Sequence, residues 1–209
     1  MTDYTYEIAW WPATDALKKD VNAYKPAADI VAKHTHLPIF AGLSVEKGDF
    51  FLLVTWENAA AHSAFLAHPD AAALAKDHPE LFPPEGAAGV LGVCHAHLNA
   101  DPLSVLSAPV VENAFLTPKE NESFDELTKT LVGVEAKRAE GGGGKYGSGT
   151  IVGTIEERPD QLVVLVGWNS VEAHTAYIAP DGPAADFVPK LREKIKGVEV
   201  HHVTYTRLA

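Results

Sequence analysis

One stretch of this chain occurs twice, and that repeat restricts the fold more than any other feature. The first copy spans residues 51–65 and the second spans residues 162–177. Each copy carries an apolar run, a tryptophan, a helix-capping residue, a histidine and an aromatic residue, in that order. Agreement in type, order and spacing indicates an internal duplication. Four pairs each lie 112 residues apart: Trp56 and Trp168, Asn58 and Ser170, His62 and His174, Phe65 and Tyr177.

The first half of the chain, which contains the first copy, predicts four strands and two helices. Apolar residues at helical spacing follow the first strand, and they predict a helix that Thr14 caps and Pro26 divides. Asn58 caps the second helix, which Pro69 breaks. The order of elements is therefore βαββαβ. Aromatic and apolar runs place the strands at 4–11, 37–45, 50–56 and 89–98.

The second half of the chain, which contains the second copy, predicts the same order of elements. Ser123 and Glu126 have the spacing of a capping box at the start of its first helix. Ser170 caps its second helix, which the turn at 180–183 interrupts. The strands are expected at 110–116, 150–156, 161–168 and 198–206. We therefore expect one repeat at 1–100, a linker at 101–108 and a second repeat at 109–209.

A βαββαβ unit is ferredoxin-like, with a four-stranded antiparallel sheet and both helices on one face. The other face of the sheet is apolar and has to be covered. Two such sheets packed face to face form a dimeric α/β barrel, and the duplication supplies both halves. The sequence predicts an α+β fold of two ferredoxin-like βαββαβ repeats forming an intrachain dimeric α/β barrel. We expect a monomeric pseudo-dimer or a homo-oligomer.

The charge balance argues against two classes of partner. The 209 residues include 17 Lys and Arg against 28 Asp and Glu, a net charge of −11. Nucleic acids and anionic membranes both need a basic surface, so neither is an expected partner. The N-terminus lacks a secretion signal, no apolar run approaches the roughly 20 residues that span a bilayer, and Cys94 is the single cysteine. We expect a cytoplasmic protein.

The repeated pattern has the form strand, Trp-x-Ser/Asn-x-x-Ala-His-x-x-aromatic. It resembles the antibiotic biosynthesis monooxygenase superfamily of dimeric α/β barrels, in a tandem form that covers essentially the whole chain. That superfamily includes cofactor-free quinol oxygenases, heme-degrading monooxygenases, cyclases and isomerases. The resemblance implies an oxygenase acting on an aromatic or polyketide-like substrate, held in a cavity between sheet and helices. The expected partner is therefore a small hydrophobic or aromatic molecule.

His62 and His174 are catalytic candidates, because the resemblance places them beside that cavity and a histidine titrates near working pH. The alternative is structural: each histidine hydrogen-bonds a neighbouring strand and fixes the fold. Aromatic residues of the two copies are expected to contact the substrate, although the tryptophans could equally belong to the core. These substrate-binding candidates are Trp10, Trp56, Phe65, Trp168 and Tyr177.

Two further residues are candidates only through the resemblance. His78 follows the break in the second helix, near the place where heme-degrading members carry their axial histidine. Glu112-Asn113 resembles the Glu-Asn pair of the same branch, so Asn113 is a catalytic candidate that would donate a hydrogen bond to a substrate oxygen. No cofactor is expected for the oxygenase, and heme is the alternative.

Histidine and glycine patterns elsewhere in the chain predict neither a metal site nor a phosphate loop. His95 and His97 share one face of a strand, a spacing that could chelate a metal, but no Cys pattern or His-x-x-x-His supports a site, so none is expected. The run Gly141–Gly144 leads to Lys145-Tyr146, without the Ser or Thr of a phosphate loop. This run is expected to be a lid or a flexible connection.

Two hypotheses of different class follow. The first is a cofactor-free oxygenase with a histidine base. The second is a protein that binds heme or a hydrophobic ligand, either as a heme-using oxygenase or as a carrier or sensor without turnover. A purely structural role, with both cavities filled by side chains, also stays open.

Overall fold

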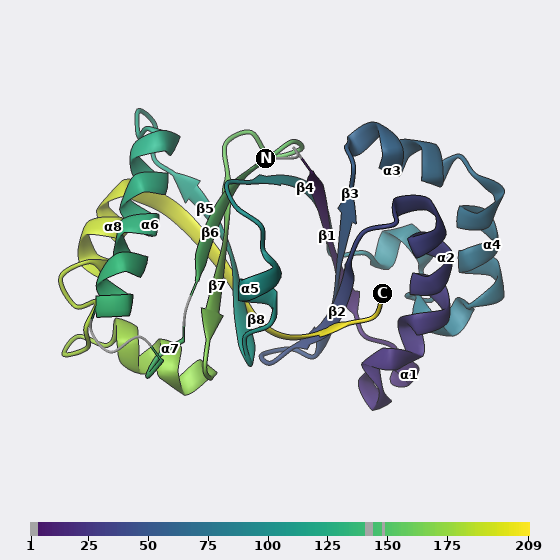
Figure 1. The fold of residues 1–209 in the computed structure, drawn as a ribbon, viewed down its shortest axis with the longest axis horizontal. Helices are drawn as coiled ribbons and strands as arrows, with labels where there is room; N and C mark the ends of the chain where they lie inside the picture. Colours follow the sequence, from purple (N-terminus) through teal and green to yellow (C-terminus); the bar gives the residue numbers. More distant parts are fainter. Residues whose placement is uncertain (1–3, 141–143, 148) are drawn as a thin grey trace. The chain divides into compact units, whose positions relative to one another are not determined.

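The computed structural model describes residues 4–140, 144–147 and 149–209 (Figure 1). Most of the glycine run expected to form a lid or connection, Gly141–Gly143, lies outside these residues. The chain forms two compact units. The first unit is Met1–His97 together with Tyr205–Ala209, and the second is Leu98–Thr204.

The first unit has an antiparallel sheet in the order β2-β3-β1-β4. Its helices lie on one face of the sheet (Figure 1). The strands are β1 (Thr5–Pro12), β2 (Ile39–Ser44), β3 (Asp49–Trp56) and β4 (Gly92–Leu98). The helices are α1 (Asp15–Lys19), α2 (Lys25–Thr35), α3 (Ala59–Leu66) and α4 (Pro69–Asp77), with short 3-10 turns at Val21–Tyr24, Pro79–Leu81 and Gly86–Gly89.

Capping and proline positions set the helix boundaries in this unit. The Thr14 side chain accepts a hydrogen bond from the Leu17 N–H, and Asn58 Oδ1 accepts one from the Ala61 N–H at 2.9 Å. Pro26 stands in the first turn of α2. Backbone N–H groups there have no partner within the helix, so the missing N–H of proline costs no hydrogen bond. The predicted division of the first helix is confirmed: α1 ends at Lys19, and α2 begins at Lys25 after the 3-10 turn at Val21–Tyr24.

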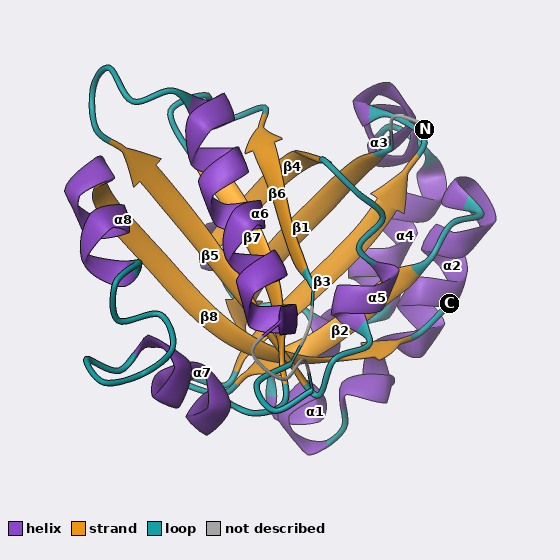
Figure 2. Cartoon of the chain, turned by 60° about the vertical axis from the view of Figure 1, so that its left-hand side comes forward, coloured by secondary structure: helices purple, strands orange, loops and turns teal. Residues whose placement is uncertain are grey.

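The second unit repeats this plan, with its sheet in the order β6-β7-β5-β8. The strands are β5 (Val110–Pro118), β6 (Thr150–Ile155), β7 (Leu162–Trp168) and β8 (Ile195–Arg207). The helices are α6 (Phe124–Glu140), α7 (Val171–Ile178) and α8 (Val188–Lys194), and a short helix α5 (Leu103–Leu106) lies in the expected linker. Figure 2 shows α6 and α8 beside the β5–β8 strands.

Strand β8 is longer than the sequence indicates. It begins at Ile195 rather than at 198, because Ile195 pairs with Pro118 across an irregularity in the register of β5. The helix before it, α8, ends at Lys194.

Each unit's sheet is extended by the segment that ends the other copy of the sequence. Leu208 N–H donates to the Ile39 carbonyl at 2.9 Å, which adds the C-terminal segment to β2, and Asn99 N–H donates to the Val152 carbonyl at 2.9 Å. The hydrogen-bonded strand order is a closed barrel, β1-β3-β2-β8-β5-β7-β6-β4, among the described residues. The predicted fold class, α+β with two ferredoxin-like repeats in a dimeric α/β barrel, is confirmed.

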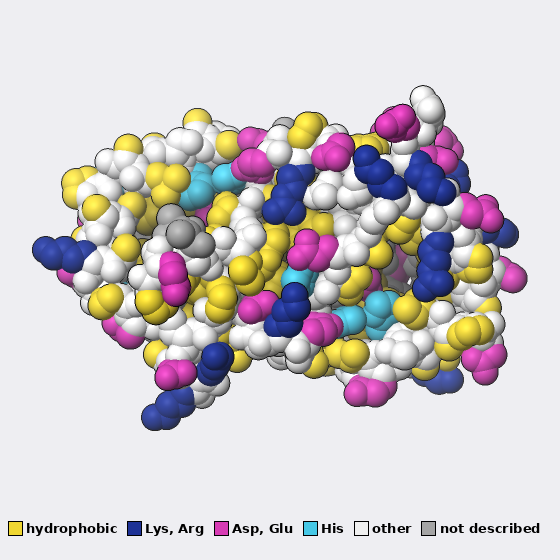
Figure 3. Space-filling view, turned by 180° about the vertical axis from the view of Figure 1, so that it is seen from behind, with side chains coloured by type: hydrophobic (Ala, Val, Ile, Leu, Met, Phe, Trp, Pro, Cys, Tyr) yellow, Lys and Arg dark blue, Asp and Glu magenta, His cyan; other side chains and the backbone are white. Residues whose placement is uncertain are grey.

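The surface mixes charge types. On the face in Figure 3, acidic and basic side chains are scattered among apolar ones. Among the described residues, no helix combines the length and the apolar character needed to cross a bilayer.

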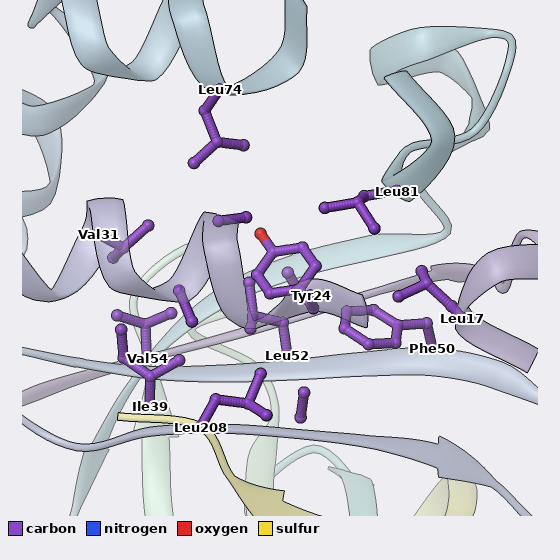
Figure 4. Packing of buried hydrophobic residues seen from close by; sticks show 14 of the residues in the cluster. Leu17, Tyr24, Val31, Ile39, Phe50, Leu52, Val54, Leu74, Leu81 and Leu208 are labelled. Atoms are coloured by element: carbon purple, nitrogen blue, oxygen red, sulfur yellow. The ribbon is translucent and has the colours of Figure 1, made fainter. Parts of the chain in front are cut away.

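Four aromatic rings fill the space between sheet and helices in the first unit. Trp11 on β1 and Phe50 on β3 lie 4.8 Å apart by ring centroids, and Tyr24 lies 5.1 Å from Phe50. Phe82 stacks on Trp11 at 5.9 Å. We call Trp11, Tyr24, Phe50 and Phe82 the ring cluster. Figure 4 shows Tyr24 and Phe50 among aliphatic side chains that include Leu17, Leu81 and the C-terminal Leu208.

The ring cluster should make a large contribution to stability. Phe50 is fully buried, so Phe50→Ala leaves a cavity and should lower the free energy of unfolding by about 3–5 kcal/mol. Urea denaturation followed by circular dichroism measures this. Leu66→Ala, at a side chain that is 63% exposed, serves as the control and should change stability by less than about 0.5 kcal/mol. Equal losses in the two variants would contradict the packing described.

Candidate functional site

A cluster of four side chains joins sheet and helix in the second unit. Trp168 Nε1–H donates a hydrogen bond to Glu112 Oε2 at 2.8 Å. His174 Nε2 lies 3.6 Å from the same carboxylate oxygen, and its Nδ1 shares a 2.7 Å hydrogen bond with His202 Nε2. The Trp168 and His174 rings stack at 4.6 Å with an interplanar angle of 19°. We call this arrangement the Glu-Trp-His-His cluster.

The first unit contains the same cluster. Trp56 Nε1–H donates to Glu7 Oε2 at 2.8 Å, and His62 Nε2 lies 3.4 Å from that oxygen. His62 Nδ1 and His95 Nε2 share a 2.7 Å hydrogen bond. The Trp56 and His62 rings stack at 4.8 Å and 19°. The two clusters therefore agree in every partner and nearly in every distance.

Sheet register explains how these residues meet. Glu112 pairs with His202 across β5 and β8, and opposed residues project from the same face of a sheet. Glu112 also pairs with Val166, so Trp168, two residues further along β7, shares that face. The Ser170 side chain accepts from the Ala173 N–H and starts α7, which brings His174 over the tryptophan ring.

Burial makes the carboxylate depend on its donors. The side chains of Glu112 and His174 are each 12% exposed, so few water molecules reach them. A carboxylate in such a place is stabilised by hydrogen bonds from the protein. Trp168 supplies one, and the imidazole of His174 lies beside the same oxygen.

The second unit has a cavity of about 200 Å³ against this cluster. Glu112, Trp168, His174 and Tyr177 line it. Most of the remaining lining is aliphatic or aromatic and comes from the β5, β7 and β8 strands and from the helices α6 to α8. The cavity is therefore apolar, with an acid and a base in its wall.

The ring cluster occupies the corresponding place in the first unit. Trp11 on β1 pairs with Phe50 on β3, and at the equivalent position of the second unit Leu116 on β5 pairs with Leu162 on β7. Two rings therefore stand where the second unit has two leucines. Burial, with the charge of Glu7 as a second cause, raises the pKa of the Tyr24 hydroxyl. Tyr24 therefore stays neutral within this packing.

The other substrate-binding candidates take different places. Trp168 and Tyr177 lie 5.5 Å apart by ring centroids and both line the cavity. Trp56 and Phe65 are their counterparts in the first-unit core. Trp10 projects from the sheet face opposite Glu7, where it stacks on Phe51 at 5.6 Å. A Cβ at Gly92 would lie 2.2 Å from the Trp10 ring, so this packing requires glycine.

Asn113 lies on the sheet face opposite Glu112, because neighbours on a strand alternate. It is fully buried, and its Nδ2 lies 3.3 Å from the Val111 carbonyl, to which it donates. The cavity lining does not include it. The structure therefore brings Glu112, and not Asn113, to the cavity.

Among the described residues, neither His78 nor His174 fits a heme. An axial histidine needs a ring nitrogen directed at an open pocket. His78 ends α4, and its Nδ1 lies 3.6 Å from Glu80 at the surface. In the second unit, His174 already bonds His202, and a cavity of about 200 Å³ is too small for a macrocycle of the size of heme.

The spacing of the side-chain atoms in the second-unit cluster suits a network of hydrogen bonds better than a bound metal ion. Glu112, His174 and His202 offer ligand atoms within 4.8 Å of one another. However, the 2.7 Å between the histidine nitrogens is well below the roughly 3.3 Å that separates neighbouring ligands of tetrahedral zinc with 2.0–2.1 Å bonds. The spacing is that of a hydrogen bond.

Sequence reasoning did not connect the glutamates or the β4 and β8 histidines with the repeated motif. Glu7 and Glu112 are 105 residues apart, and His95 and His202 are 107 apart, so neither pair follows the offset of 112. A signal was present: both first strands contain Glu-x-Ala, at Glu7 and at Glu112. Aligning each strand separately would have found it.

Comparisons with known proteins bear on the fold. No protein-family model matches the sequence, and no curated protein matches it. A candidate monooxygenase from Fusobacterium nucleatum has a TM-score of 0.64 and 8% identity, with 100% of this chain and 94% of that chain covered. An anthrone oxidase-like protein has a TM-score of 0.66 and 11% identity, with 99% and 94% covered. A heme-binding protein from Thermus thermophilus has a TM-score of 0.50 and 10% identity, with 97% and 92% covered.

These similarities extend over nearly the full length of each chain. At such low identities they establish a shared fold. The chemistry has to be argued from the residues of this chain.

Trp168 and Glu112 should be energetically coupled. Trp168→Phe removes the N–H donor of a buried carboxylate and should lower the free energy of unfolding by about 1–3 kcal/mol. In a Glu112→Gln background the same exchange should have a smaller effect, because no charge is left without its donor. A double-mutant cycle by chemical denaturation measures the coupling, and strictly additive effects would contradict it.

Proposed function

We propose that the second unit is an oxygenase site that binds a small aromatic or polyketide-like molecule and uses His174 as its general base. One observation carries the proposal: an apolar cavity has the Glu112–His174 pair in its wall. An apolar pocket with a few convergent polar groups is the usual form of a small-molecule site.

The proposal assigns one tautomer to His174. In the proposed resting state, Nδ1–H of His174 donates to His202 Nε2, so Nε2 of His174 carries the lone pair. That nitrogen accepts a proton from the substrate, and the imidazolium that forms is stabilised by Glu112, 3.6 Å away. Trp168 holds the carboxylate in place through its N–H.

The chemistry requires a substrate with an acidic C–H group. Loss of a proton to His174 gives a carbanion, delocalised over aromatic rings and a carbonyl, that reduces O2 directly. When the reacting carbon is a methylene, each molecule of O2 converts one methylene to a carbonyl and releases one molecule of water. One oxygen atom replaces the two hydrogens on carbon and the other leaves in water, so O2 is the oxidant and the base returns to its resting state.

The lining supports an aromatic substrate. Trp168 and Tyr177 present ring surfaces, and side chains such as Leu116, Val164 and Phe187 provide apolar contact. Burial of apolar area would provide most of the binding free energy. The polar pair then fixes the orientation of the acidic carbon.

A second candidate function is ligand binding without turnover. The observation that favours it is that both ring nitrogens of His174 already face protein groups, His202 and Glu112. In that case the Glu-Trp-His-His cluster would only brace the wall of a carrier or sensor, as its copy does in the packed first unit.

Turnover of an acidic aromatic methylene tests the oxygenase. With anthrone as probe, the protein should consume one O2 per quinone formed, measured with an oxygen electrode and by absorption. His174→Gln should reduce kcat by about a hundredfold or more, since a positioned general base contributes roughly 10²–10⁴-fold. His62→Gln is the matched exchange in the first unit and should retain turnover. Binding of anthrone without oxygen uptake would favour the carrier.

The cavity itself can be closed with a residue that the first unit already uses. Leu116→Trp places an indole where the first unit has Trp11 and should weaken anthrone binding at least about tenfold, because the side chain takes the ligand's space. Quenching of tryptophan fluorescence measures the Kd. Val45→Ala, at an exposed side chain in the first unit, should leave binding unchanged. Unaltered binding in Leu116→Trp would place the ligand elsewhere.

A further inference from the structure

A second group of ligating side chains lies in the first unit, away from the Glu-Trp-His-His cluster. His34 is in the last turn of α2, and His68 and Asp70 stand at the start of α4. His34 Nε2–H donates to Asp70 Oδ2 at 2.9 Å, and His68 Nδ1 lies 3.6 Å from the same oxygen. The two histidine rings are 4.6 Å apart by centroids.

Local structure brings the three residues together. His68 is the N-cap residue of α4, in the extended backbone conformation, and Pro69 follows it in the first turn. The break between α3 and α4 therefore turns His68 and Asp70 toward α2. Phe65, at the end of α3, packs against the His34 ring at 5.0 Å and limits its orientation.

We propose that His34, His68 and Asp70 form a binding site for a divalent transition metal such as Zn²⁺, with water as the fourth ligand. Two imidazoles and one carboxylate are ligands that zinc takes in open sites. Their ligand atoms lie within 4.8 Å of one another. The His68–Asp70 separation of 3.6 Å is close to the roughly 3.3 Å expected between ligands of tetrahedral zinc, and the 2.9 Å hydrogen bond between His34 and Asp70 would have to lengthen when an ion replaces its proton.

The site is open to solvent, so an ion could enter and keep a water molecule. The side chains of His68 and Asp70 are 48% and 44% exposed, and that of His34 is 23% exposed. Figure 3 shows that histidine side chains reach the molecular surface.

Two existing interactions would be replaced on binding. The proton that His34 shares with Asp70 would leave, as it does whenever a metal displaces a proton from its ligand. His68 Nδ1 now accepts the Asp70 N–H at 3.2 Å, and solvent would take over that exposed donor. Lys33 adds a positive charge near the carboxylate, which opposes the cation.

A bound ion would join α2 to α4. Because it binds the folded chain, it should raise Tm as its concentration rises above Kd. No sequence motif predicts this site, because residue 34 and residues 68 and 70 belong to separate helices. The sequence expectation of no metal was drawn from spacing alone.

The test uses the full chain after removal of metal with a chelator. Zn²⁺ titrated by calorimetry should bind with one strong site per chain, and Co²⁺ should give the visible absorption of a site with histidine ligands. His34→Gln and Asp70→Asn keep the size of each side chain and should each weaken binding about a hundredfold or more. Circular dichroism confirms that each variant is folded.

The matched control is His78→Ala, which removes a histidine that has one carboxylate neighbour, Glu80, and should leave the Zn²⁺ affinity unchanged. The proposal is overturned if His34→Gln and Asp70→Asn bind Zn²⁺ as the parent does. It is equally overturned if the strong site disappears instead in His174→Gln, because the ion would then occupy the Glu-Trp-His-His cluster of the second unit.

Discussion

The hydrogen bond from a tryptophan N–H to a buried glutamate is the interaction on which both halves of this structure depend. It occurs twice with the same length of 2.8 Å, at Trp56 with Glu7 and at Trp168 with Glu112. Each bond ties neighbouring strands together and orients a carboxylate toward the histidine of the following helix. An ionised group in such a place persists only when the protein supplies its partners, so the four residues of each cluster depend on one another.

This cluster recurs in both units, but the packing beside it differs. Its structural role can therefore be distinguished from a functional one. In the first unit the ring cluster packs between sheet and helices, and in the second an apolar cavity lies beside the corresponding strands. The cluster can therefore be a brace in one unit and, by our proposal, a catalytic base in the other. A duplicated chain has this freedom, because one copy can maintain the fold while the other binds a ligand.

Much of this was predictable from the repeat. Trp56 and Trp168, with the histidines six residues later, led to the correct α+β fold, and capping residues such as Asn58 and Ser170 fixed the helix starts. The partners of the histidines were not predictable from that offset. Glu7 meets His62 only through strand register and helix packing, which depend on the folded sheet. The difference between Trp11 and Leu116, which decides where a cavity remains, was visible in the sequence but had no meaning before the strands were aligned.

Xenon offers the most direct test of the central claim, that the two units share a polar cluster and differ in their cavities. Xenon enters dry apolar cavities, and a crystal under xenon pressure shows each bound atom as a strong density peak. The account predicts xenon in the second unit beside Trp168 and Tyr177, with none among Trp11, Tyr24, Phe50 and Phe82. Xenon within the ring cluster, or a second unit closed to it, would contradict the account.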